Sequence, residues 1–215
     1  MKTLIATLLT LGICTSAGAA CRDANAFQGV GSINTQGGGT YIFGMTVGGV
    51  SVMRGTLERR GNGLPDRSFD LDTPYHIDFA EAGFVRTVAP GVAEAAPAGT
   101  VLSAELRAQR GLPDALPGTA WDGRMIAAIR ADGVDVAEVP LDANYSFLAE
   151  MQAEIDGCIY RIQPVALTLA LQGSTVLQRR VLYFPDLGVS AITRWGPDAE
   201  GAVRTTGITG FGDGE

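Results

Sequence analysis

The sequence predicts an all-β protein in which an antiparallel meander is curled into a barrel or half-barrel, with little helix. In several runs apolar and polar residues alternate with a period of two, as a half-buried strand requires. Glycine-containing pairs, such as Asp132-Gly133 and Asp156-Gly157, separate these runs. Because the runs follow each other closely, neighbouring strands pair in sequence order, and the sheet must curl to hide its apolar face.

Residues 1–20 have the pattern of a signal peptide. Lys2 precedes a short apolar run, and small residues end the segment, so that cleavage after Ala19 or Ala20 is expected. No later stretch is apolar and long enough to cross a bilayer as a helix. The sequence therefore predicts a periplasmic or secreted protein with no transmembrane segment after signal removal.

Cys21 follows the leader directly and has three possible fates. A lipid anchor is less favoured, because lipoprotein processing prefers a leucine-like residue three positions before the cysteine and Gly18 stands there. Cleavage removes Cys14, which leaves Cys21 and Cys158 as an even pair in an oxidising compartment. We expect a Cys21–Cys158 disulfide, with two separately buried thiols as the alternative.

The mature chain divides by composition into three parts. Residues 21–39 are rich in glycine and small polar residues and are expected to be an irregular N-terminal segment. Residues 40–200 carry the strand patterns and are expected to form a single β domain. Residues 201–215 lose the pattern, which predicts a flexible tail.

The first half of the domain contains weaker signals. Gly48-Gly49 between apolar runs predicts a hairpin, and alternation around Phe69 and around Ile77 predicts two strands. Residues 90–98 are the best candidate for a linker. The pattern of residues 100–111 fits either a strand or a short helix.

The second half predicts four or five consecutive antiparallel strands. Its hairpin turns are Asp132-Gly133, Asp156-Gly157 and residues 172–174. One strand should present Phe147 to Ile155 on one face, and another should present Leu187 to Trp195.

Charge narrows the class of partner. The chain has 16 Lys and Arg against 23 Asp and Glu, and loss of Lys2 with the leader moves the net charge from −7 to −8. Nucleic acid and anionic membrane surfaces are therefore not expected as partners.

Side chains that could perform chemistry are few. His76 is the single histidine and lies near Asp72 and Asp78, but the chain has no Gly-x-Ser-x-Gly motif, and we expect a partly exposed strand histidine. Asp66 and Asp70, with those two aspartates, could gather around calcium, but they lack EF-hand spacing and fit the solvent face of a strand. No cofactor, metal or catalytic residue is predicted.

Apolar side chains of the second half could line a pocket inside the curled sheet. They would be either a packed core, which the sequence favours, or a cavity for an apolar ligand. The six residues are Phe147, Met151, Ile155, Leu182, Phe184 and Trp195.

Residues 118–195 carry three short motifs: Gly118 with Trp121, Cys158 with Tyr160, and Tyr183 with Pro185 and Gly188. In this order they resemble the TapB-like proteins, a group of exported bacterial proteins of unknown function. The resemblance implies a half-barrel distantly similar to periplasmic lipoprotein and lipid carriers, and it supplies no catalytic residues. Taken alone, the last motif fits a barrel corner, in which Pro185 interrupts a strand, Asp186 closes the turn and Gly188 re-enters the sheet.

Together these patterns favour an exported, non-enzymatic binding or envelope-associated module, whose partner is an apolar small molecule or an envelope protein. One alternative is a secreted hydrolase that uses carboxylates brought together in space. Another is a small outer-membrane barrel, which the glycine-rich C-terminus of the chain disfavours.

Overall fold

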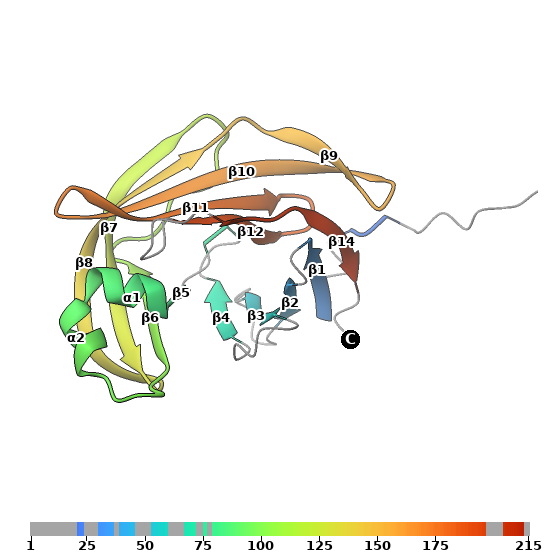
Figure 1. Ribbon diagram of the computed structural model, residues 1–215. Coiled ribbons are helices and arrows are strands. Elements are labelled where there is room, and N and C mark those ends of the chain that lie inside the picture. The colour runs from blue at the N-terminus through green and yellow to red at the C-terminus, as the bar shows by residue number, and fades with distance from the viewer. Residues whose placement is uncertain are drawn as a thin grey trace, which may run out of the picture.

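The protein is an antiparallel β half-barrel made of two sheets, which confirms the expected fold class (Figure 1). The computed structural model describes residues 21–23, 30–36, 39–45, 53–59, 67–71, 75–76, 79–196 and 204–212. The predicted signal peptide, the Gly48-Gly49 pair, and residues 66, 72, 77 and 78 lie outside these ranges. The division into domains remains a prediction.

The larger sheet has nine strands and follows the predicted meander. Its main path is β13-β12-β11-β10-β8-β7-β6-β5, and β9 pairs with β10 beside that path. The strands are β5 (Phe79–Glu81), β6 (Leu102–Ala108), β7 (Ala120–Ala131), β8 (Val134–Phe147), β9 (Met151–Ile155), β10 (Cys158–Leu171), β11 (Ser174–Phe184), β12 (Val189–Gly196) and β13 (Arg204–Thr205). The open choice for residues 100–111 is thus resolved in favour of a strand, β6.

Two-residue turns with positive φ at both positions connect the long strands, as the sequence indicates. The φ values are 50° and 82° at Asp132-Gly133, 52° and 77° at Asp156-Gly157, and 51° and 82° at Gln172-Gly173. Turns of this kind match the twist of antiparallel strands, and glycine tolerates the left-handed second position. These three turns fix the register of β7 with β8, β9 with β10, and β10 with β11.

Strand β10 changes its buried face along its length. Tyr160 and Ile162 are buried in its first half, and Val165 and Leu167 are buried in its second half. Side chains alternate along a strand, so the two halves bury opposite faces. The change occurs at Pro164, where the partner on one side of β10 switches from β9 to β8.

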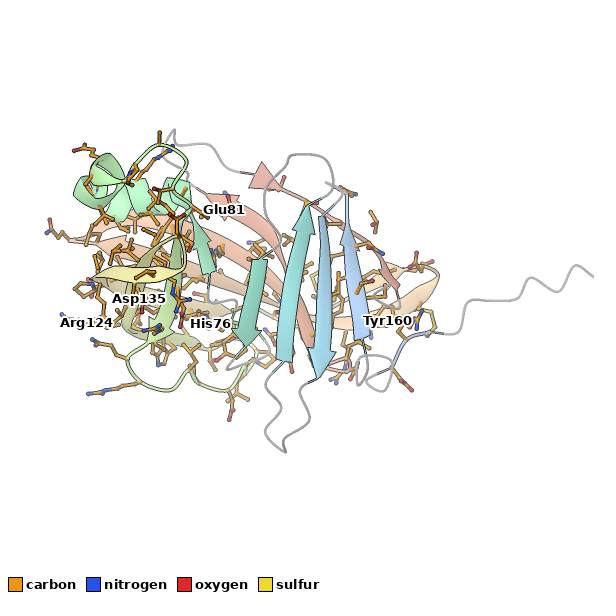
Figure 2. All side chains as sticks on the ribbon, turned by 90° about the horizontal axis from the view of Figure 1, so that it is seen from below. His76, Glu81, Arg124, Asp135 and Tyr160 are labelled. Carbon is orange, nitrogen blue, oxygen red and sulfur yellow. A yellow bond between two sulfur atoms is a disulfide. The ribbon has the colours of Figure 1, made fainter. Side chains whose placement is uncertain are left out.

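The smaller sheet contains both ends of the described chain. Its order is β14-β1-β2-β3-β4, with β1 (Val30–Thr35), β2 (Gly39–Met45), β3 (Met53–Arg59), β4 (Arg67–Leu71) and β14 (Ile208–Gly212). Figure 2 shows this sheet lying across the larger one, and Figure 1 shows β1 to β4 beneath β10 and β11. It therefore covers part of the opening that the curled sheet leaves.

Two expectations about the chain ends need correction. The segment expected to be irregular contains β1, and the segment expected to be a flexible tail contains β13 and β14. Strand β14 pairs with β1, for example Ile33 with Phe211. Neither strand alternates clearly enough to be predicted from its own sequence. Each is stabilised by pairing with a strand that is distant in sequence.

The candidate linker at residues 90–98 is also corrected, because most of it is helical. Helix α1 (Ala82–Val88) buries Phe84, Val85 and Val88, and α2 (Pro90–Ala95) follows immediately. Proline is favoured in the first turn of a helix, since its missing N–H has no partner to lose there. The two short helices pack beside β6 at one end of the larger sheet (Figure 1).

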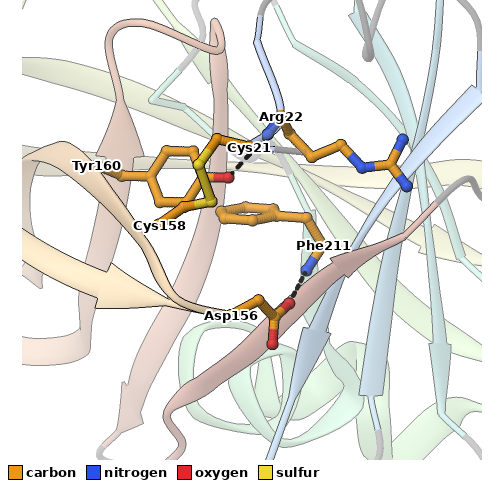
Figure 3. The surroundings of a disulfide bond; sticks show 6 residues. All are labelled: Cys21, Arg22, Asp156, Cys158, Tyr160 and Phe211. Atoms are coloured by element: carbon orange, nitrogen blue, oxygen red, sulfur yellow. Dashed lines mark hydrogen bonds between the residues drawn. A yellow bond between two sulfur atoms is a disulfide. The ribbon is translucent and has the colours of Figure 1, made fainter. Parts of the chain in front are cut away.

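The predicted disulfide is present and ties the N-terminus to the β9–β10 hairpin (Figure 3). The Cα atoms of Cys21 and Cys158 are 5.6 Å apart. The backbone N–H of Arg22 donates to the Tyr160 hydroxyl at 3.0 Å, and the N–H of Phe211 donates to the Asp156 carboxylate at 3.3 Å. The hairpin thus holds both the start of the described chain and strand β14.

Around this disulfide three aromatic rings pack edge to face. The ring centroids of Tyr160 and Phe211 are 4.9 Å apart, and those of Phe184 and Phe211 are 5.3 Å apart. Such contacts are worth about 0.5–1.5 kcal/mol each beyond the area that they bury. We call Cys21, Cys158, Tyr160, Phe184 and Phe211 the clamp.

Two strands differ in detail from their predicted patterns. The chain leaves the sheet between Phe147 and Met151, so the single strand predicted there is split into β8 and β9. In β12, every residue from Val189 to Thr193 is buried, so both faces of this strand are covered and burial does not alternate as predicted.

Candidate functional site

The six residues predicted to line an apolar pocket do not gather in one place. Phe147 and Phe184 are both fully buried, but Phe147 packs against Tyr75 and Phe184 packs in the clamp. Ile155 is buried on β9, Leu182 is half-buried on β11, and Met151 is 51% exposed. Trp195 lies on β12, and its side chain is outside the described part of the structure. Within the described residues, the interior around Phe147 and Phe184 is packed core.

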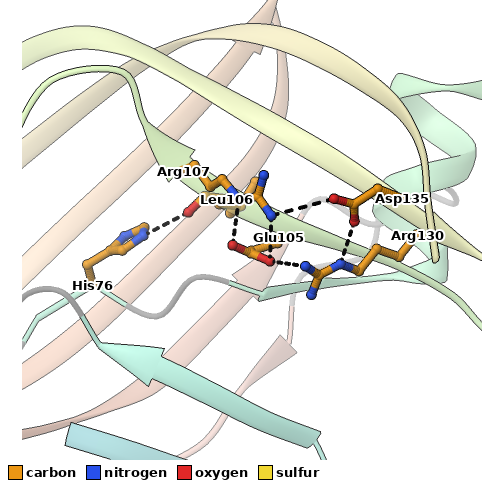
Figure 4. Close-up of polar contacts among 6 residues, drawn as sticks. All are labelled: His76, Glu105, Leu106, Arg107, Arg130 and Asp135. Carbon is orange, nitrogen blue, oxygen red and sulfur yellow. Dashed lines mark hydrogen bonds and ion pairs between the residues drawn. The ribbon is translucent and has the colours of Figure 1, made fainter. Parts of the chain in front are cut away.

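His76 is buried and lies outside any strand, so the expected partly exposed strand histidine is a wrong prediction. Only 2% of its surface is exposed. Its Nε2 lies 3.1 Å from the carbonyl oxygen of Leu106, which can only accept, so Nε2 carries the hydrogen (Figure 4). Its Nδ1 therefore accepts the hydroxyl hydrogen of Tyr145 at 2.6 Å.

Tyr145 ties this histidine into the core. Burial raises the pKa of the Tyr145 hydroxyl, and the nearby positive charge of Arg179 partly opposes that rise. The hydroxyl therefore keeps its proton and donates to His76. Since Tyr145, His76 and Arg179 are all buried, this arrangement stabilises the interior and offers no substrate access.

An open cavity of about 440 Å³ lies close to the clamp along the chain, since two of its lining residues, Tyr183 and Pro185, flank Phe184. Five separate parts of the chain form it: the loop between β6 and β7, the connection between β8 and β9, strand β10, the end of β11 with the corner after it, and Tyr75 before β5. The lining residues are Tyr75, Leu112, Pro113, Asp114, Ala115, Pro117, Glu150, Gln163, Tyr183 and Pro185.

Two buried side chains hold the cavity walls in place. The Tyr75 hydroxyl donates to the carbonyl of Pro113, which fixes the β6–β7 loop. The Gln163 side chain donates from Nε2 to the carbonyl of Leu148, which fixes the β8–β9 connection. Because each residue is at least 98% buried, both bonds form in a poorly solvated setting where an unmade bond is costly.

The floor of the cavity comes from a cross-strand pair. Gln163 on β10 lies opposite Tyr183 on β11, and directly opposed residues point to the same face of a sheet. Burial raises the pKa of the Tyr183 hydroxyl, and the negative charge of Asp186 adds to the rise. At neutral pH the ring therefore presents a neutral hydroxyl.

Ion pairs surround one side of the cavity. Arg161 binds Asp186 through two nitrogens, with Nη2 to Oδ1 at 2.5 Å and Nε to Oδ2 at 2.9 Å. The nearest approach of Arg161 to Glu150 is 3.5 Å. The hydrogen bond from Arg161 lowers the pKa of Asp186. Asp186 thus pairs with Arg161, and the expectation that its side chain closes the turn is not met.

The turn at Asp186 is closed by backbone hydrogen bonds. The N–H groups of Leu187 and Gly188 both donate to the carbonyl of Phe184, at 3.1 and 2.9 Å. Gly188 has a φ of 69°, which a residue with a Cβ rarely adopts. Pro185 and Gly188 therefore act as the predicted corner, and Pro185 also lines the cavity.

A second ion-pair network lies on the outer surface of β6 to β8 (Figure 4). Arg130 contacts Glu105 at 2.5 Å and Asp135 at 2.7 Å, and Arg107 contacts Glu105 at 2.6 Å. The hydrogen bond from Arg107 lowers the pKa of Glu105, and the hydrogen bond from Arg130 lowers the pKa of Asp135. With each charge matched on an exposed sheet face, this network indicates surface stabilisation.

Sequence patterns alone did not single out the cavity residues, apart from the Tyr183 and Pro185 motif. Tyr75 directly precedes His76, but its own sequence context gave no sign of a site. The loop of residues 112–117 had no pattern that distinguished it from an ordinary connection. Proline at 113, 117 and 185 is the one signal that could have pointed there.

For metals, no group of three or more His, Cys, Asp or Glu residues gathers within the described ranges. Asp66, Asp72 and Asp78 lie outside those ranges, and Asp70 is on β4, where side chains are not described. The calcium interpretation is therefore untested.

Comparison with known proteins gives no relative: no family model, no curated protein and no solved structure matches the chain. Among the described residues, the helices are too short to span a membrane.

Proposed function

We propose that this protein is a non-enzymatic binding module of the extracytoplasmic space, and that the cavity binds a small molecule with an apolar body. The observation that carries this proposal is a preformed cavity of about 440 Å³, whose walls are held in place by the buried hydrogen bonds of Tyr75 and Gln163. Ligand sites are typically concave, largely pre-formed and lined by apolar side chains with a few convergent polar groups.

The walls fit this description. Two tyrosine rings, three prolines, a leucine and an alanine form most of the lining, with polar groups from Asp114, Glu150 and Gln163. The disulfide and the leader pattern support an oxidising, extracytoplasmic location.

A matched pair of loop variants tests the site. Ala115 lines the cavity, whereas its neighbour Leu116 is 59% exposed and is not a lining residue. Ala115→Trp should fill the cavity and reduce binding of an uncharged fluorescent hydrophobic probe such as N-phenyl-1-naphthylamine by about tenfold or more. Leu116→Trp should leave it unchanged. Equal probe binding by both variants, measured by fluorescence titration, would contradict the proposal.

A secreted hydrolase is the second candidate, because Asp114 and Glu150 line the same cavity. Paired carboxylates of this kind can act as acid and base on a glycosidic bond. A panel of nitrophenyl glycosides tests it. The hydrolase gains support only if turnover is detected and Asp114→Asn or Glu150→Gln abolishes it, and the binding function predicts no turnover with the parent protein.

A further inference from the structure

Apart from the Tyr183 hydroxyl, the polar groups that the cavity offers to a ligand are acceptors, and two of them carry negative charge. Only 1% of the Gln163 surface is exposed, and its amide nitrogen donates a hydrogen bond to the Leu148 carbonyl. Its Oε1 accepts no hydrogen bond from any other described residue, although Gln163 lines the cavity. An amide oxygen that lines a cavity and has no partner in the described part of the protein favours a ligand that brings its own N–H or O–H donor.

The charge around the cavity is unbalanced toward negative. Asp114 and Glu150 line it, and Asp186 lies at its edge beside Pro185. Among the described side chains the basic residue at this site is Arg161, and Asp186 engages it through two nitrogens at 2.5 and 2.9 Å. Glu150 is held more loosely, at 3.5 Å. One arginine therefore faces three carboxylates, and most of its hydrogen bonding goes to the one that does not line the cavity.

The remaining walls suit the apolar part of a cation. Tyr183 is half-buried and contributes an aromatic ring to the lining, and an ammonium or guanidinium group is attracted to the face of such a ring. Pro113, Pro117 and Pro185 add rigid apolar surface beside it.

From these contacts we infer that the cavity selects organic cations, namely a primary amine or an amidinium attached to an aromatic or branched aliphatic group. This inference rests on the proposed binding function and specifies its ligand class. The cation contacts the Asp114 and Glu150 carboxylates, donates a hydrogen bond to Gln163 Oε1, and places its apolar body against the tyrosine and proline walls.

Three probes of nearly equal size separate charge from shape: benzylamine, benzyl alcohol and benzoate. Titration of the mature, disulfide-bonded protein is followed by two-dimensional NMR at the backbone amides of residues 112–117 that have one, and of Gln163. We expect benzylamine to bind saturably and about tenfold or more tightly than benzyl alcohol, with benzoate weakest, because charge-assisted hydrogen bonds are the stronger ones. Higher ionic strength should reduce the preference.

Carboxylate variants locate the effect. Asp114→Asn should weaken benzylamine binding about fivefold to tenfold and leave benzyl alcohol unchanged, because only the charge is removed. Glu150→Gln should act in the same direction. Asp142→Asn removes an exposed carboxylate on β8, outside the cavity, and is the matched control.

The outcomes distinguish the two levels of the proposal. If benzyl alcohol binds as tightly as benzylamine, or if Asp114→Asn and Glu150→Gln both leave benzylamine affinity intact, the cation preference is overturned and the binding function stands. If none of the three probes binds saturably at the cavity amides, and Ala115→Trp and Leu116→Trp bind the hydrophobic probe equally, both are overturned.

Discussion

The clamp and the cavity are built from neighbouring parts of the same strand, β10, but differ in what those parts do. At its beginning, β10 contributes Cys158 and Tyr160 to the clamp, where a covalent bond and three aromatic rings close the structure. Directly after Ile162, the same strand contributes Gln163 to the floor of an open cavity.

The two features are held together by different kinds of contact. In the clamp, the disulfide and the aromatic contacts link segments that are far apart in sequence, including both ends of the described chain. The cavity is braced by buried hydrogen bonds and keeps part of its polar surface unused. Pro164, which has no N–H to donate, stands where β10 exchanges one partner strand for another.

Breaking the clamp should have the largest effect on stability. Cys21 and Cys158 are 137 residues apart in the sequence, and closing such a loop restricts the unfolded chain by roughly 5 kcal/mol at most. The double variant Cys21→Ser with Cys158→Ser should lower the free energy of unfolding by about 2–5 kcal/mol, measured by urea titration. Binding at the cavity should persist below the transition.

Chemical reduction of the parent protein is the control, and it should reproduce the loss. A folded double variant that no longer binds the cavity probe would show that the clamp and the cavity are coupled, which contradicts this prediction.

The buried hydrogen bond near the cavity should have a smaller effect. Tyr145→Phe leaves the Nδ1 of His76 without its donor in the core, which should cost about 1–3 kcal/mol in the free energy of unfolding. Tyr160→Phe is the matched change in the clamp, where the hydroxyl accepts from the half-buried Arg22 N–H. We expect it to cost less than about 1 kcal/mol. Equal losses in urea titrations would refute this ranking.

The local features of this fold were predictable from sequence because local chemistry decides them. Asp132-Gly133 and Asp156-Gly157 form turns of the expected kind, since the glycine tolerates a backbone conformation that few other residues adopt. The even count of cysteines left after the leader pointed to Cys21 and Cys158, and the disulfide between them is present.

What could not be predicted depends on contacts between distant segments. Strand β14 forms by pairing with the edge of β1. Neither of the two sequences alternates strongly enough to predict a strand. His76 looked like a surface residue because its partners, Tyr145 and Leu106, are remote in sequence.

The cavity could not be predicted from the sequence for the same reason. Tyr75, Asp114, Glu150 and Gln163 come from four different segments, and only the tertiary arrangement places them together. Period-two patterns identify which face of a strand is buried, but they do not reveal that a buried glutamine opens on a cavity.

The ion pair at the cavity edge should have the smallest effect, and its dependence on pH has a definite sign. The hydrogen bond from Arg161 lowers the pKa of Asp186 below the ordinary value of 3.8. As the pH falls, the unfolded chain therefore takes up this proton before the folded protein does. The pair stabilises the fold above about pH 4, and this contribution disappears as the pH falls through the lowered value in the folded state. Because both side chains are about half exposed, solvent screening keeps the contribution small. Urea midpoints of the parent and Asp186→Asn should differ slightly at pH 6 and converge toward pH 3, and Asp142→Asn controls for the loss of an exposed carboxylate. A difference that grows on acidification would mean that Asp186 is held by something other than Arg161.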